Sequence, residues 1–143
     1  MEEQYNRKWR YLSSYAQHKM RLRRLLQQRD EYAVLRGKAS NLGTTITRGS
    51  TSDETGEIAA SLLDSIERIN AKIDDCCKLL SAIILYIEHA DITETDKLIL
   101  TSRFVKQMNS EQIYAEIDEP YRGRAAARKR IRRIVEKLPP IKG

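Results

Sequence analysis

The sequence contains few of the residues that interrupt helices. Its 143 residues include six glycines and three prolines, and residues 3–40 contain no proline and a single glycine, Gly37. Glycine and proline are the least favourable residues in a helix interior, so their scarcity favours long, uninterrupted helices. We therefore predict an all-α fold.

Cysteine is scarce, and long apolar runs are missing. The two cysteines, Cys76 and Cys77, are adjacent, and on a helix they point about 100° apart, a poor geometry for a disulfide between them. We predict that Cys76 lies in the core, that Cys77 flanks it, and that neither binds a metal.

The longest nearly apolar run, residues 79–87, has nine residues, whereas a membrane span needs roughly 20. The N-terminus is acidic and no apolar segment follows it, so we expect a soluble, cytoplasmic protein without membrane contacts.

The sequence also lacks motifs for catalysis. It has no glycine-rich phosphate loop, no HExxH zinc motif and no nucleophile elbow. The adjacent Asp74 and Asp75 point in neighbouring directions on a helix, which is typical of a solvated surface. We predict that the protein is not an enzyme, with no catalytic residue, no metal ligand and no cofactor.

Positive charge is in excess, and it is concentrated at the two ends of the chain. The formal net charge is +6. Residues 1–50 carry 11 basic and 4 acidic side chains, and residues 121–143 carry 9 and 1. Residues 51–93 carry 3 basic and 9 acidic side chains, and residues 94–120 carry 3 and 6. Two positive segments therefore enclose a negative middle, and each segment needs its own explanation.

Residues 1–92 are predicted to form a helical arm. Apolar residues recur every three or four positions from Tyr5 to Leu35, which indicates an amphipathic helix. Glycine, threonine and serine in residues 41–52 predict a loop, after which Ser52 or Asp53 can cap a second helix. The second helix carries a heptad seam in which steps of four and three alternate: Leu62, Ile66, Ile69, Ile73, Cys76, Leu80, Ile83 and Ile87.

This seam needs a partner helix, and two partners fit. One is the basic first helix, folded back as a long antiparallel, coiled-coil-like hairpin in which opposite charges offset each other, although exposed pairs contribute only ~0.2–1 kcal/mol each. The other is a second copy of the chain, which would give a homodimer through the arm. The charge offset also accounts for the basic residues of the first helix, whose alternative role is contact with DNA phosphates.

Residues 93–143 are predicted to form a separate small domain of three helices. The Thr93–Asp96 segment is typical of a capping box that opens a helix through about Gln107. Ser110 can cap a second helix over residues 111–117, and a turn follows because Pro120 lacks the N–H that would continue it. The last helix is predicted over residues 122–138. A short helix, a turn and a strongly basic helix in this order predict a helix-turn-helix domain.

The last helix combines an apolar stripe with a basic surface. The stripe consists of Ala127, Ile131, Ile134, Val135 and Leu138. The candidate DNA-binding residues are Arg122, Arg124, Arg128, Lys129, Arg130, Arg132 and Arg133. At 100° per residue, Arg122, Lys129 and Arg133 project opposite the stripe, and the other four lie on its flanks or nearer the buried edge. Arginine can pair with O6 and N7 of guanine, and small Ala125 and Ala126 let the backbone approach. We therefore predict contact with double-stranded DNA.

Three segments of this domain resemble the region-four helix-turn-helix of bacterial sigma factors: residues 102–105, 109–113 and 128–138. The chain as a whole is similar to the RinA and ArpU-like late-transcription regulators of phages and prophages of Gram-positive bacteria, including at residues 11–15 and 47–50. These proteins join an N-terminal helical pair to a sigma-like domain. The resemblance implies sequence-specific control of phage late or packaging genes in the host cytoplasm, alongside host RNA polymerase. The turn over residues 118–123 is several residues longer than the standard one.

Two other functions fit the same sequence. A small terminase-like DNA-packaging subunit also joins a helix-turn-helix to oligomerisation helices, and ring-shaped oligomers would favour it. A helical protein-interaction adaptor could use the basic helix on an acidic protein surface. The adaptor would be favoured if DNA binding were absent.

Overall fold

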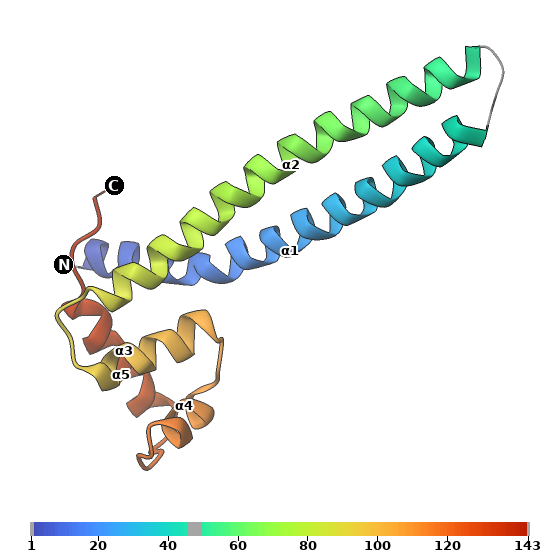
Figure 1. Ribbon diagram of the computed structural model, residues 1–143. Helices are drawn as coiled ribbons and strands as arrows, with labels where there is room; N and C mark the ends of the chain where they lie inside the picture. The colour runs from blue at the N-terminus through green and yellow to red at the C-terminus, as the bar shows by residue number, and fades with distance from the viewer. Residues whose placement is uncertain (1, 46–49, 143) are drawn as a thin grey trace. The chain divides into compact units, whose positions relative to one another are not determined.

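The computed structural model describes residues 2–45 and 50–142, with the side chains of residues 2–39 and 56–142. Every regular element in these ranges is a helix, which confirms the all-α prediction. The elements are α1 (Glu2–Thr45), α2 (Ser50–Glu88), α3 (Glu94–Leu100), the π-helix η1 (Thr101–Val105), α4 (Ser110–Glu116) and α5 (Arg124–Lys137) (Figure 1). No helix among them is both long enough and apolar enough to cross a bilayer.

Both long helices extend into the segment predicted as a loop. Helix α1 continues to Thr45 and α2 begins at Ser50, so the predicted loop over residues 41–52 is wrong at both ends. Ser52 and Asp53, predicted as capping residues, lie inside α2. Once a helix is nucleated, each further residue adds a hydrogen bond at little cost, which lets residues of low helix propensity extend its ends. The predicted loop residues 46–49 lie outside the described residues.

The chain forms two compact units. One contains residues 1–19 and 79–143, and the other contains residues 20–78. This division does not coincide with the boundary predicted between residues 92 and 93. The first turns of α1 and the last turns of α2 group with the short helices because they contact the C-terminal end of the chain. Lys8 Nζ donates to the carbonyl of Glu136 at 3.1 Å, and the Tyr86 hydroxyl donates to the carbonyl of Pro139.

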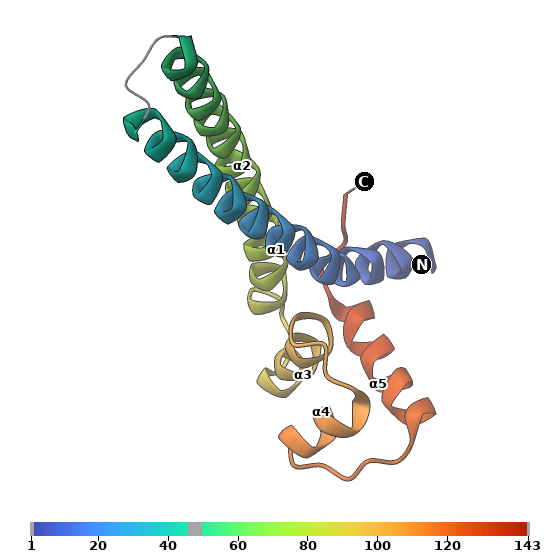
Figure 2. The ribbon, with the colours of Figure 1, turned by 90° about the vertical axis from the view of Figure 1, so that its right-hand side faces the viewer.

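In the unit of residues 20–78, α1 and α2 pack together along part of the predicted seam (Figure 2). Its core contains Leu25, Ile69, Ile73 and Cys76, with Leu22, Leu26 and Tyr32 packed against it. Cys76 is buried and Cys77 is exposed, as predicted. Arg29 Nη1 donates to Asn70 Oδ1 at 3.4 Å, which adds one polar contact between the two helices.

The other unit has a larger core. The side chains with under 2% exposure include Leu12 of α1, Ile83 and Ile87 of α2, Ile99 and Leu100 of α3, Ile113 of α4 and Val135 of α5. They come from all five α-helices. Burial of these side chains fixes the short helices, which are too short to be stable alone.

Side-chain caps begin the short helices α3 and α4. The Thr93 hydroxyl accepts from the Asp96 N–H at 3.1 Å, so the predicted N-cap at Thr93 is confirmed. The reciprocal bond of the predicted capping box, from the Thr93 N–H to the Asp96 side chain, is not formed between these two described residues. At α4 the cap is Asn109 and not the predicted Ser110, which is the first residue of the helix. The Asn109 and Gln112 side chains form a reciprocal capping box, with distances of 2.9 and 3.0 Å. Asparagine is as good a cap as serine, and the amide of Gln112 completes the pair.

The helix predicted to run through about Gln107 is divided. Helix α3 ends at Leu100 and is followed by η1, which ends at Val105, two residues before Gln107, a residue with φ 56°. The Met108 N–H then donates to the Ser102 carbonyl at 2.9 Å, which closes the end of this segment. Buried Ser102 donates from Oγ to Glu116 Oε2 at 3.2 Å, so the π-helix is tied to α4.

The turn between α4 and α5 has defined ends. Asp118 has φ 56°, and the N–H groups of Asp118 and Glu119 donate to the carbonyls of Ala115 and Tyr114 at 3.3 and 3.0 Å. This is a Schellman motif, which satisfies the last carbonyls of α4. Gly123 has φ 98° and immediately precedes α5, so α5 begins at Arg124 and Arg122 lies in the turn.

Candidate nucleic-acid interface

Helix α5 carries the predicted apolar stripe on its buried side. Ala127, Ile131, Ile134, Val135 and Leu138 are each at most 6% exposed. Helix α3 contacts α5 on this side. Because the stripe is packed, α5 has a fixed rotation about its axis, and its charged residues are directed to defined positions.

Five of the seven candidate residues are exposed cations without an ion pair among the described residues. They are Arg122, Arg124, Arg128, Lys129 and Arg133. Ala125 and Ala126 are also exposed, so this surface of α5 has little bulk between its long cationic side chains. Arg122 belongs to the turn, and its predicted helical projection beside Lys129 and Arg133 is therefore wrong.

An open groove of about 850 Å³ lies beside α5. Its walls come from the start of α1, from η1 and the residues before α4, from the turn, and from α5. The lining residues are Tyr5, Trp9, Arg103, Gln107, Met108, Asn109, Ser110, Glu111, Tyr121, Arg124, Arg128, Lys129, Ile131 and Arg132. Five of them are basic and one is acidic, so the groove attracts anions.

Aromatic rings stiffen the far wall of this groove. The Trp9 ring contacts Phe104 edge to face, with ring centroids 5.0 Å apart. The Arg103 guanidinium lies 5.8 Å from the Trp9 ring centroid and 5.5 Å from that of Phe104. Cation–π contacts of this kind hold an arginine in place while leaving its N–H groups available.

Arg130 is engaged within the protein. Its Nη1 and Nη2 donate to the two carboxylate oxygens of Glu119 at 2.8 and 3.0 Å, and its Cζ lies 5.6 Å from the Tyr114 ring centroid. The hydrogen bond from Arg130 lowers the pKa of Glu119, and the same bond raises the pKa of Arg130. Tyr114 also contacts Tyr121 edge to face, with centroids 5.7 Å apart. Arg130 therefore fastens the long turn to α5.

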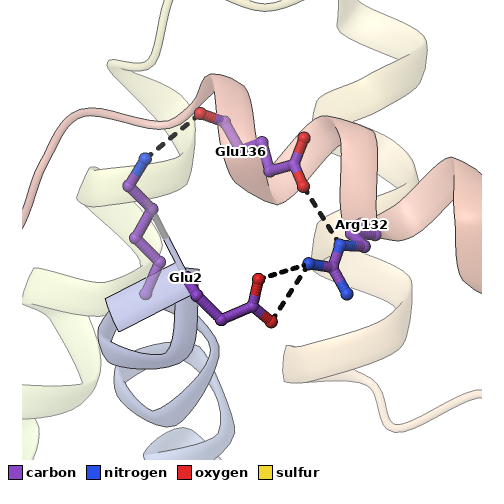
Figure 3. A network of polar contacts seen from close by, with 4 residues as sticks. Glu2, Arg132 and Glu136 are labelled. Carbon is purple, nitrogen blue, oxygen red and sulfur yellow. Dashed lines mark hydrogen bonds and ion pairs between the residues drawn. The ribbon is translucent and has the colours of Figure 1, made fainter. Parts of the chain in front are cut away.

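Arg132 is also engaged, at the edge of the groove. Its Nη2 lies 3.2 and 3.0 Å from the two carboxylate oxygens of Glu2, and its Nε donates to Glu136 Oε1 at 3.1 Å (Figure 3). Its Cζ lies 4.5 Å from the Tyr5 ring centroid. Hydrogen bonds to Glu136 and then to Glu2 raise the pKa of Arg132. Two of the seven candidates are thus neutralised by the chain's own carboxylates, and the other five have no ion pair within the described part of the chain.

Sequence reasoning missed the contribution of α1 to this surface. Trp9 and Tyr5 fit the apolar periodicity of the first helix, which assigns them to a core and gives no sign of a groove. Arg103 lies outside both basic segments of the sequence and was therefore not among the candidate residues. The spacing of these residues carries no signal that would bring them beside α5, because their proximity depends on how the helices pack.

The described residues contain no group of three or more potential metal ligands. Comparison of the chain with protein families, curated proteins and solved structures gives no match. The functional interpretation therefore depends on the geometry and charge of the surface itself.

Proposed function

We propose that the protein binds double-stranded DNA through α5 and regulates transcription. The observation that carries the proposal is the set of exposed α5 cations, Arg124, Arg128, Lys129 and Arg133, which have no ion pair among the described residues. They project from a helix whose other side is packed. A rigid, cationic helix with small residues between the cations suits the major groove of DNA.

The surroundings of α5 support a helix-turn-helix. Helix α4 precedes it, both ends of α4 are capped, and the turn is fastened by the pair between Arg130 and Glu119. In such a domain the first helix crosses the DNA backbone and the second enters the groove. We assign Lys129 and Arg133, which project opposite the buried stripe, to base edges, and Arg124 and Arg128, which lie nearer the buried edge of α5, to phosphates.

The biological setting is proposed from the sigma-factor resemblance. It is control of phage late or packaging genes at promoter DNA, in the host cytoplasm and alongside host RNA polymerase. The packing of α1 against α2 in residues 20–78 supports a hairpin arm. We further propose that this arm forms a homodimer, because its surface exposes Val34, Leu35, Ile58 and Leu63. A dimer would place two α5 helices on two half-sites.

The proposal is tested by gel shift on DNA fragments from the protein's own genomic neighbourhood, repeated at rising salt. We expect one fragment to be retained specifically, with log affinity falling linearly against log salt. The double variant Lys129→Ala, Arg133→Ala should lose its preference for that fragment, at roughly 1–3 kcal/mol for each base contact removed.

The matched control is Arg68→Ala, Lys78→Ala. Both residues are exposed on α2, and the control lowers the net charge from +6 to +4 as the test variant does. It should leave the fragment preference intact. Equal weakening of the test variant on all DNA would mean that Lys129 and Arg133 contact only phosphates. If the protein retains no DNA at any salt concentration, the proposal is overturned in favour of an adaptor for acidic proteins. Ring-shaped oligomers would favour a DNA-packaging subunit.

A further inference from the structure

In the pair between Glu2 and Arg132, the Glu2 carboxylate occupies an arginine that would otherwise be available to a DNA phosphate in the groove. Arg132 lines the groove together with Arg124 and Arg128. Its Nη2 contacts both oxygens of Glu2, at 3.2 and 3.0 Å (Figure 3). An arginine N–H group can donate to a carboxylate oxygen or to a phosphate oxygen.

Resting on the proposed function, we propose that Glu2 is an internal competitor of DNA. Its carboxylate occupies Arg132 in the free protein and is displaced by a backbone phosphate when DNA binds. The N-terminal turn of α1 thereby sets the affinity of the α5 surface without itself contacting DNA.

The pair is weak enough to be displaced. The Glu2 side chain is 71% exposed and that of Arg132 is 47% exposed, so water and salt screen their attraction. Exposed pairs of this kind alter an equilibrium by about a factor of five at most. A DNA phosphate lies within the polyanionic field of the duplex and so competes with an advantage over a single carboxylate.

Arg132 would remain in place after Glu2 is released. Glu136 holds its Nε at 3.1 Å, and the Tyr5 ring lies under its guanidinium. The start of α1 also stays attached. The Gln4 side chain donates to and accepts from the backbone of Ile141 at 3.2 and 3.1 Å, and buried Lys8 bonds the Glu136 carbonyl. Loss of the Glu2 charge should therefore free Nη2 of Arg132, while Nε stays bound to Glu136, without unfolding this region.

The test measures DNA affinity against salt for wild type, Glu2→Gln and Glu3→Gln in the full chain. Glu3 is the matched control, because it is the neighbouring residue and its carboxylate binds Arg7 at 2.8 Å. Each variant removes one negative charge and frees one arginine, but Arg7 does not line the groove described beside α5. We expect Glu2→Gln to bind about two- to fivefold more tightly than Glu3→Gln. The log–log salt slopes should be equal, because the same DNA phosphates are neutralised in each complex.

A double-mutant cycle with Arg132→Ala completes the experiment. In the Arg132→Ala background, Glu2→Gln should no longer differ from Glu3→Gln, because the arginine that it releases is absent. Equal affinities for the two single variants overturn the competition. Weaker binding by Glu2→Gln also overturns it, since the pair would then orient α5 for DNA. If wild type shows no salt-dependent DNA binding, the proposed function fails first and the competition with it.

Discussion

The two compact units of this chain bury their apolar side chains to different extents. In residues 20–78, the core is a single row of contacts between two helices, and the large apolar residues Met20, Val34, Leu35, Ile58 and Leu63 are at least 36% exposed. In the unit of residues 1–19 and 79–143, side chains from five helices are nearly inaccessible, and the exposed large apolar residues are Leu79, Ile84 and Leu85 of α2. Two helices alone can cover one face of each other, whereas several helices can enclose a core.

This difference separates two roles. A closed core holds α5 at a fixed rotation, so the positions of its cations are determined by packing. An arm with exposed apolar residues has surface left for a partner, since contiguous exposed apolar patches mark interaction sites.

The largest effect is expected from the closed core. Leu100 is completely buried, and Leu100→Ala should lower the free energy of unfolding by about 2–5 kcal/mol, because it leaves a cavity among packed helices. Urea unfolding followed by circular dichroism measures this loss. DNA affinity should fall with it, since the support of α5 is loosened.

The matched control is Leu79→Ala in the same unit. Leu79 is 42% exposed, so the same substitution should change the free energy of unfolding by less than about half of the loss at Leu100. Similar losses for the two variants would show that the core is not closed around α3.

A smaller effect concerns the fastened turn. Arg130 lowers the pKa of Glu119 below its usual 4.5 in the folded protein. A carboxylate with a lowered pKa contributes stability above its unfolded value, and this contribution is lost as pH falls through the lowered value. Glu119→Gln should therefore be less stable than wild type at pH 7, and the gap should close as the pH falls below 4.5.

The measurement is the free energy of unfolding of both proteins at pH 7 and at several values below 4.5. Glu111→Gln serves as the control because Glu111 is acidic, exposed and in the same helical region, with no ion pair among the described residues. A constant gap between Glu119→Gln and wild type across this range would contradict the assigned role of the pair.

Local sequence signals predicted the individual helices better than they predicted how these helices pack together. Few glycines and prolines predicted the helices, the 3,4 spacing predicted the burial of Ile69, Ile73 and Cys76, and the Thr93 cap was confirmed. These signals act within one helix, where geometry follows directly from spacing. At the loop the composition misled, because helix extension outweighed the low propensity of residues 41–45.

The candidate site was only partly predictable from the sequence. The exposed cations of α5 follow from their positions relative to the buried stripe. The ion pairs of Arg130 and Arg132 could not be predicted in this way, because Glu119 lies in the turn and Glu2 lies 130 residues away from Arg132 in the chain. The position of Trp9 beside the groove could not be predicted either. Which charges stay free depends on contacts between distant segments, and no local pattern encodes them.

The smallest effect tests the arm. Val34 is 57% exposed, and in a lone helix Val→Ala exchanges some apolar burial for better helix propensity, so the two contributions nearly cancel. In a homodimer that covers Val34, the substitution would instead lose about 0.8 kcal/mol per buried methyl group. We expect Val34→Ala to lower the midpoint of unfolding at high protein concentration and to match wild type on dilution, because only the dimer buries this side chain. Sedimentation equilibrium of both proteins would follow the association directly. Identical midpoints at every concentration would mean that this face of the arm does not bind a second copy, and the exposed apolar residues would need a different partner.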